Sequence, residues 1–275
     1  MAENSGIAWT THTFNPWIGC TKVGPGCDHC YAEAWNRRYD GGANWGPGAP
    51  RRRTKTWGHP LRWQRERRAA LDHGENPELV RVFCASLADV FDNEVPAEWR
   101  VDLWNLIGQC PDLEWQLVTK RVGNVRKMAP LIGFPANVIV LSTIVNQAEA
   151  NRDLDKLCDL KRDGIAHHIG VSYEAALGPV DWTPWLGLDA YGPNWLIVGG
   201  ESTQGGAEAR WFELDWAYST LEQGRAYGVP IFIKQFGSRA MGGSGFPYKT
   251  SDRAGADPSE WLADLRVREF PILTS

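Results

Sequence analysis

The sequence predicts an α/β protein that folds as a single (β/α) barrel, incomplete or distorted. Short apolar runs recur from residue 81 onward, and each is followed by a polar turn. A helical pattern usually follows the turn, which is typical of repeated βα units with parallel strands. With a further strand near Phe14, the predicted strands number about seven. This count favours a barrel of TIM type over the alternative, an open doubly wound sheet.

The expected strands are short and apolar, and they are spaced almost regularly. After the strand near Phe14, they cover residues 81–85, 115–118, 138–141, 168–171, 195–198 and 231–233. Helices are expected between them over residues 97–109, 147–160 and 214–227. Pro96 and Gly228 are typical of a helix start and a helix end. A final helix is expected around residues 261–267, whereas residues 180–194 are too broken to predict one.

We expect residues 1–275 to form one barrel domain, because this length can bury one sizeable core and no low-complexity linker divides it. Residues 41–78 are predicted to be a basic insertion rich in Gly and Trp. Residues 237–259 are rich in Gly, Ser and Asp and are predicted to be a long surface loop.

Composition limits the classes of function. No stretch of eighteen apolar residues exists, and the N-terminus Met-Ala-Glu-Asn-Ser lacks the features of a signal peptide. We therefore expect a cytoplasmic protein with no membrane partner; its oligomeric state is not predicted. The formal net charge is -4, so a polyanion would have to be met by a local basic patch.

Three clustered cysteines are the strongest functional signal. Cys20, Cys27 and Cys30 are separated by six and then two residues, in a loop that contains Gly24, Pro25 and Gly26. Such a loop can wrap three thiolates around one metal centre and leave the fourth position open. A 4Fe-4S cluster held by three thiolates presents one iron to a small molecule, whereas structural zinc normally takes four protein ligands.

Two alternatives remain for these thiols. The first is a zinc knuckle completed by His29 or His12, and the second is three unrelated thiols in a reducing compartment. The other cysteines, Cys84, Cys110 and Cys158, lie in apolar or helical stretches and are expected to be ordinary buried thiols.

Polar residues follow every predicted strand. The cysteine loop follows the first strand. The groups that follow the later strands, in chain order, are Ser86 and Asp89; Thr119, Lys120 and Arg121; Ser142, Thr143, Asn146 and Gln147; Ser172 and Glu174; Gly199, Gly200, Glu201 and Ser202; and Lys234 and Gln235. The carboxyl ends of parallel barrel strands lie at one mouth. We therefore expect a single polar basin around the cysteines.

Two of these positions have a specific expected role. Gly199-Gly200 lets backbone approach a ligand, while Glu201 offers a carboxylate to an ammonium or a ribose hydroxyl. The alternative for this motif is a tight strand-to-helix turn. Lys234 ends an apolar strand and needs an anionic partner, either Glu174, Glu201 or substrate, because an unpaired buried ammonium is costly.

A basic segment within the insertion mixes arginines with flat rings. It contains Arg51, Arg52, Arg53, Lys55, Arg62, Arg65, Arg67 and Arg68, interleaved with Trp57 and Trp63. Phosphate backbones and exposed bases are bound by this combination, which favours a nucleic acid or nucleotide partner. A solvated basic helix face is the alternative. No Walker loop, His-Glu-x-x-His or nucleophile-elbow serine is present.

Motifs along the whole chain resemble one family. They are the run from Trp9 through Asn15, Pro16 and Trp17 to Cys20, the run from Cys27 to Glu33, Thr119-Lys120-Arg121, Leu177-Gly178-Pro179-Val180, Val198-Gly199-Gly200-Glu201-Ser202 and Ile233-Lys234-Gln235-Phe236-Gly237. Together they resemble a family of phage-type proteins of unassigned function that carry a three-cysteine motif. That family is similar to radical S-adenosylmethionine enzymes.

The resemblance implies a cofactor set. By it, Cys20, Cys27 and Cys30 bind a 4Fe-4S cluster whose open iron chelates S-adenosylmethionine, and an external electron donor reduces the cluster to release a 5′-deoxyadenosyl radical. Glu201, Glu174 and Lys234 are the expected catalytic residues, which orient S-adenosylmethionine or substrate. The expected cofactor contacts are Gly199, Gly200, Glu201, Ser202, Thr119 and Asn15. The expected substrate contacts are Lys120, Arg121, Arg51, Arg52, Arg53 and Gln235.

The predicted function is therefore a cytoplasmic iron-sulfur enzyme that modifies or repairs a nucleic acid or nucleotide. The main alternative is a zinc-stapled nucleic-acid-binding protein without catalysis, in which the basic segment does the binding. A barrel hydrolase or lyase without iron is a third.

Overall fold

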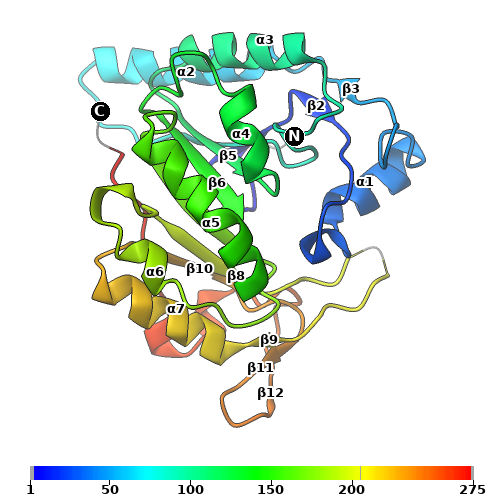
Figure 1. The fold of residues 1–275 in the computed structure, drawn as a ribbon, viewed down its shortest axis with the longest axis vertical. Coiled ribbons are helices and arrows are strands. Elements are labelled where there is room, and N and C mark those ends of the chain that lie inside the picture. Colours follow the sequence, from blue (N-terminus) through cyan, green and yellow to red (C-terminus); the bar gives the residue numbers. More distant parts are fainter. Residues whose placement is uncertain (1–2, 205, 274–275) are drawn as a thin grey trace.

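Seven parallel strands form the central sheet of the protein (Figure 1). The computed structural model describes residues 3–204 and 206–273. The sheet has the order β1-β4-β5-β6-β7-β8-β10. Its strands are β1 (His12–Phe14), β4 (Arg81–Cys84), β5 (Glu114–Thr119), β6 (Val138–Thr143), β7 (His168–Glu174), β8 (Leu196–Gly199) and β10 (Ile231–Gln235). All seven predicted strands are confirmed.

The strand order explains the shape of the sheet. Neighbouring strands follow one another along the chain, so every crossover proceeds in the same direction. Because such crossovers are right-handed, their helices are placed on one face and the sheet curls around the other. Within the described residues, β1 and β10 are edge strands that do not pair with each other. The fold is therefore an incomplete barrel-like α/β structure and not a doubly wound sheet.

The helices are α1 (Tyr31–Asp40), α2 (Gly58–Asp72), α3 (Ala97–Gly108), α4 (Val122–Met128), α5 (Gln147–Arg162), α6 (Thr183–Leu186) and α7 (Leu214–Ala226). Helices α2 to α7 follow one another around the outside of the curled sheet, whereas α1 lies apart from them (Figure 1). The three helices predicted between strands are confirmed as α3, α5 and α7. At the start of α5, the side chain of Asn146 accepts a hydrogen bond from the backbone N–H of Glu149 at 3.0 Å, as expected of an N-cap.

The predicted final helix is wrong. Residues 261–267 contain only the 3-10 turn Ala263–Leu265, which follows another at Pro258–Glu260. The chain then runs beside β10, where the N–H of Ile233 donates to the carbonyl of Val267 at 2.8 Å and that of Glu269 to Ile231 at 3.0 Å. Backbone groups paired in this way with a strand edge cannot also form helical hydrogen bonds.

Two apolar cores lie on the two faces of the sheet. The larger one fills the space between the sheet and its helices. The smaller one lies inside the curl and contains Trp9, Phe83, Ile139, Leu141, Trp195, Ile197 and Phe232. Because strand side chains alternate between faces, Ile139 and Leu141 put Thr143 on the same inner face, nearer the carboxyl end of β6. The inner face of the sheet is thus apolar along most of the strands and polar at their carboxyl ends, where the barrel mouth lies.

The predicted insertion and the predicted surface loop both contain regular elements. In residues 41–78, β3 (Arg52–Arg53) pairs antiparallel with β2 (Trp17–Ile18), and α2 follows. In residues 237–259, β11 (Ala240–Met241) and β12 (Pro247–Tyr248) form a small sheet with β9 (Phe212–Glu213). None of the helices in the described residues has the length and apolar character needed to cross a membrane.

Candidate functional site

A pocket of about 350 Å³ opens at the carboxyl ends of the parallel strands. This volume falls in the range of small-molecule sites. Its walls include residues that end or follow six of the strands: Ala85 and Ser86, Thr119 to Arg121, Thr143, Ser172 and Glu174, Gly200 to Ser202, and Lys234 and Gln235. Cys20, Cys27 and Cys30 line the same pocket. The structure thus brings the cysteines and the strand-end polar residues together, as the sequence predicts.

Each cysteine is placed by a different short element. Cys20 follows β2 and forms an isolated bridge with Trp45. Cys27 ends the 3-10 turn that starts at Pro25, and Cys30 is the residue before α1. All three are free thiols of intermediate exposure, so they are accessible from the pocket without lying on the open surface.

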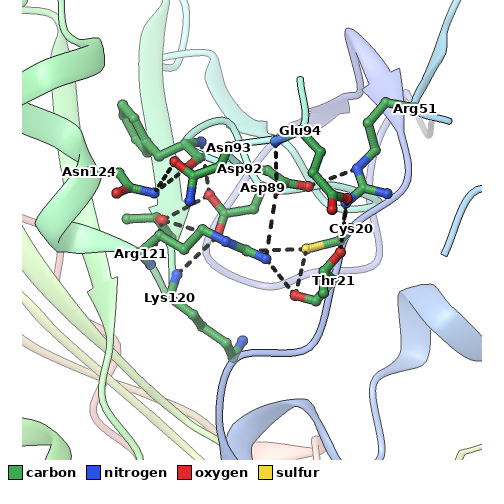
Figure 2. A network of polar contacts seen from close by, with 12 residues as sticks. Cys20, Thr21, Arg51, Asp89, Asp92, Asn93, Glu94, Lys120, Arg121 and Asn124 are labelled. Carbon is green, nitrogen blue, oxygen red and sulfur yellow. Dashed lines mark hydrogen bonds and ion pairs between the residues drawn. The ribbon is translucent and has the colours of Figure 1, made fainter. Parts of the chain in front are cut away.

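Arg121 connects Cys20 to a buried acidic pair (Figure 2). Its guanidinium donates to the Cys20 sulfur at 3.3 Å and to Asp89 at 3.1 Å. It also lies 3.9 Å from a carboxylate oxygen of Asp92. Burial and the nearby Asp89 raise the pKa of Cys20 to about 12, with Arg121 opposing the rise. A metal would displace the thiol proton, because coordination deprotonates a thiol outright.

Cys30 has a different electrostatic environment. It precedes the first turn of α1, where its side chain makes no capping hydrogen bond but lies near the backbone N–H groups of Ala32 and Glu33. Burial raises the pKa of Cys30, while Lys120 and these amides oppose the rise. A helix N-terminus stabilises a thiolate through the same amides. Two of the three pocket thiols, Cys20 and Cys30, therefore lie near a protein cation or backbone amides that favour the thiolate form.

The described residues contain no group of three or more His, Cys, Asp or Glu side chains arranged to hold one metal ion. A zinc knuckle needs such convergence on a single point. Neither histidine considered for it is free, since His29 is hydrogen-bonded to Glu201 and His12 stacks on Trp63 with a centroid separation of 4.3 Å. An iron-sulfur cube makes a different demand, because each thiolate binds a different iron. Cys20, Cys27 and Cys30 line one pocket, and the predicted cluster stays a prediction.

Glu201 lines the pocket, but both its carboxylate oxygens are used by the protein. Arg210 donates to them from Nη2 at 2.6 Å and from Nε at 3.0 Å, and its backbone N–H donates at 2.9 Å. His29 Nδ1 lies 2.9 Å from the same carboxylate. Burial raises the pKa of Glu201, but the hydrogen bonds from Arg210 and His29 outweigh it, so the pKa is lowered. The Glu201 carboxylate is therefore already paired within the protein, and its contact with a cofactor stays a prediction.

Lys234 and Glu174 form an ion pair of 2.5 Å at the pocket wall. Both side chains are largely buried, with exposed fractions of 23 % and 15 %. Glu174 is one of the three partners predicted for Lys234. Gly199 makes room for this pair, since a Cβ there would lie 3.0 Å from a Glu174 oxygen. Gly200 is needed for another reason, because its Cβ would lie 2.2 Å from the carbonyl oxygen of Phe236.

Lys120 is the pocket cation without a partner. The other lysines and arginines of the wall are paired: Lys22 with Asp28, Arg121 with Asp89, and Lys234 with Glu174. The Lys120 side chain leads away from the Arg121 network (Figure 2), and among the described residues its ammonium has no hydrogen bond or ion pair. Its stem passes over the cysteine loop, where a Cβ on Gly26 would lie 3.2 Å from Lys120 Cε.

Arg51, Arg52 and Arg53, the first three arginines of the basic segment, lie outside the pocket wall. Arg51 has a fully buried side chain that binds Asp92 at 2.8 Å and also pairs with Glu94. Arg52 pairs with Asp40 at 2.6 Å, and Arg53 pairs with Asp102 at 2.7 Å and stacks over Trp57. Their charges are neutralised by carboxylates that are distant in sequence. This corrects the expectation that Arg51 contacts substrate, because its guanidinium is enclosed by protein.

Three further residues predicted to contact cofactor or substrate, Asn15, Thr119 and Gln235, form hydrogen bonds to other protein groups. Asn15 is buried outside the pocket wall, where it donates to Ser86 at 2.9 Å and accepts from the N–H of Leu87 at 2.6 Å. Thr119 donates to Asp89 at 2.8 Å. Gln235 donates to the Ser202 hydroxyl at 2.8 Å and to the Gly200 carbonyl at 2.8 Å. Thr119, Gln235 and Ser202 line the pocket.

Arg210 and Asp92 are central to the site but were not predicted from the sequence. Each lies in a polar loop without a recognisable motif. Only the three-dimensional contacts of Arg210 with Glu201 and of Asp92 with Arg51 reveal them.

Comparisons with known proteins give a family but no activity. A family model described as "Protein of unknown function (DUF5131)" matches residues 4–259. No curated protein matches the chain. A solved structure described as a 2,5-diketo-D-gluconic acid reductase B is similar over 63% of this chain, with 13% sequence identity and a TM-score of 0.31. The similarity covers 57% of that chain, so this chain spans little more than half of its length.

Proposed function

The chain belongs to the DUF5131 family of proteins of unknown function, and from its site we propose that it is an iron-sulfur enzyme of radical S-adenosylmethionine type. Its substrate is a nucleic acid or nucleotide, which it modifies or repairs. One observation carries the proposal: Cys20, Cys27 and Cys30 line a single pocket at the carboxyl-terminal mouth of a curled parallel sheet.

The donor chemistry of this pocket supports a cluster. Three thiolates that bind a 4Fe-4S cluster add negative charge, which Arg121 offsets at Cys20 through its hydrogen bond of 3.3 Å. When bound, such a cluster supplies an open iron for S-adenosylmethionine and the electron that cleaves it. Cys84, Cys110 and Cys158 are buried and lie outside the pocket wall, so the electron donor is external.

Other residues of the pocket wall orient the ligands and exclude water. Glu174 and Lys234 present a carboxylate and an ammonium at the ends of β7 and β10, where they orient polar groups of cofactor or substrate. The lower wall is formed by Trp9, Phe83 and Val118. These apolar side chains exclude water from the inner end of the pocket, which protects a reactive intermediate.

Lys120 supports an anionic substrate. Its ammonium has no ion-pair partner among the described residues and is therefore available to an anionic ligand group. A phosphate is such a group, and both nucleotides and nucleic acids carry one. Arg51, Arg52 and Arg53 are already paired with carboxylates, whereas Lys120 lies in the pocket wall, so we place phosphate recognition at Lys120.

Anaerobic reconstitution tests the proposal. We expect brown protein with broad absorbance near ~400 nm and about four irons per chain, together with 5′-deoxyadenosine formed from S-adenosylmethionine under reduction. A variant with all three pocket cysteines changed to alanine should lose both, whereas Cys110→Ala should keep both. Colourless protein with about one zinc per chain would instead support a zinc-stapled binding protein and overturn the enzyme.

A further inference from the structure

Arg210 reaches beyond Glu201 to the loop that carries the cysteines. Its Nη1 donates to the carbonyl of Pro25 at 2.8 Å and lies 3.4 Å from the carboxylate of Asp28. His29, in the same loop, binds Glu201 at 2.9 Å. Glu201, Arg210 and His29, here named the clasp, therefore connect the end of β8 to the loop around Cys27 and Cys30. In Figure 1 the segment before α1 and the segment after β8 lie side by side.

The cysteine loop has little local structure to fix it. Between Gly24 and Cys30 its backbone makes two turn hydrogen bonds, from Cys27 to Gly24 at 2.9 Å and from Asp28 to Pro25 at 3.2 Å. Gly24 and Gly26 add conformational freedom to the unfolded and partly folded chain. In the clasp, the buried carboxylate of Glu201 accepts charge-assisted hydrogen bonds from Arg210, and such bonds are about twice as strong as neutral ones.

We propose that Arg210 and Glu201 are positioning residues that hold the loop so that Cys27 and Cys30 face the pocket. None of the hydrogen bonds that Arg210 makes with the described residues is to a sulfur, and it acts through Glu201 and the Pro25 carbonyl. The role in cluster binding rests on the proposed function, whereas the role in fixing the thiols does not. Outer residues of this kind typically change metal affinity by about 10- to 100-fold when they are removed.

Arg210→Met and Glu201→Gln test the inference against a matched control. Arg239→Met is the control, because Arg239 also pairs with a glutamate, Glu208, at 2.9 Å and stacks over Trp211. In protein without metal, alkylation of Cys27 and Cys30 by iodoacetamide should become several-fold faster in both clasp variants and stay unchanged in Arg239→Met. In reconstituted protein, iron release to a chelator should become about tenfold faster or more.

The two readouts separate the two proposals. Wild-type protein that takes up no cluster overturns the proposed function, while the alkylation rates still decide the clasp. Clasp variants that match wild type in both readouts overturn the positioning role. Arg210→Lys, which keeps one charge but cannot bridge Glu201 and Pro25, should give intermediate rates. Glu201→Gln keeps the shape of the side chain, so it decides the question if Arg210→Met does not fold.

Discussion

The guanidinium of Arg121 donates to the sulfur of Cys20 at 3.3 Å while it also binds Asp89 at 3.1 Å. A single side chain thus joins one thiol of the pocket to a carboxylate that is 5 % exposed. Because Asp89 holds Arg121 in place, the hydrogen bond to sulfur is fixed before any metal binds.

Removal of this hydrogen bond should lower the reduction potential of a cluster bound at Cys20. Hydrogen bonds to sulfur stabilise the more negative, reduced state. We expect a fall of tens of millivolts in Arg121→Met, measured by redox titration followed by EPR, and a smaller fall in Arg121→Lys. Arg126→Met is the control, because Arg126 pairs with exposed Asp163 on the protein surface. An unchanged potential in Arg121→Met would show that Arg121 only stabilises the fold.

Lys120 should give phosphate-bearing ligands an advantage in binding. With adenosine 5′-monophosphate and adenosine as probes, wild type should bind the monophosphate about 10- to 100-fold more tightly, since a hydrogen bond to a charged group contributes about 1.5–3 kcal/mol. Lys120→Met should bind the two probes equally in calorimetric titrations. Lys22→Met should keep the difference, because Lys22 is paired with Asp28 near the open edge. Equal binding of both probes by wild type would contradict the role.

Glu174 and Lys234 should be energetically coupled. Their charges are 2.5 Å apart and mostly shielded from water, so either single change leaves an uncompensated charge in the pocket wall. We expect Glu174→Gln and Lys234→Met each to destabilise the protein, and the double variant to recover about 1–2 kcal/mol relative to the sum. Urea unfolding of all four proteins measures this coupling. Strict additivity would mean that the pair contributes no interaction free energy.

Arg51 and Arg52 are neighbours in sequence, yet their substitutions should differ greatly. Arg51 has no exposed side-chain surface and pairs with Asp92, so Arg51→Met should lower the free energy of unfolding by about 3–5 kcal/mol. Arg52 is 46 % exposed, and Arg52→Met should cost less than about 1 kcal/mol. Chemical denaturation compares them directly. Similar losses in both variants would refute the structural role given to Arg51.

The arrangement of the fold could be predicted because it depends on local patterns. Each strand carries its own apolar run, and each run is followed by polar residues such as Thr119 or Glu174. Parallel pairing then brings those polar ends to one mouth without further information. The short spacing of Cys27 and Cys30 limits how far apart they can lie.

Partnerships between distant residues could not be predicted. The basic segment has the same composition whether its arginines face solvent, phosphate or protein, and only the positions of Asp92, Asp40 and Asp102 decide which. The sequence likewise does not show that the carboxylate of Glu201 is bound by Arg210 and His29. The sequence by itself determined the strands, their polar ends and the cysteine cluster, because these follow from periodicity and short spacing. Tertiary structure alone decided which charges are neutralised, because that depends on distances between residues far apart in the chain.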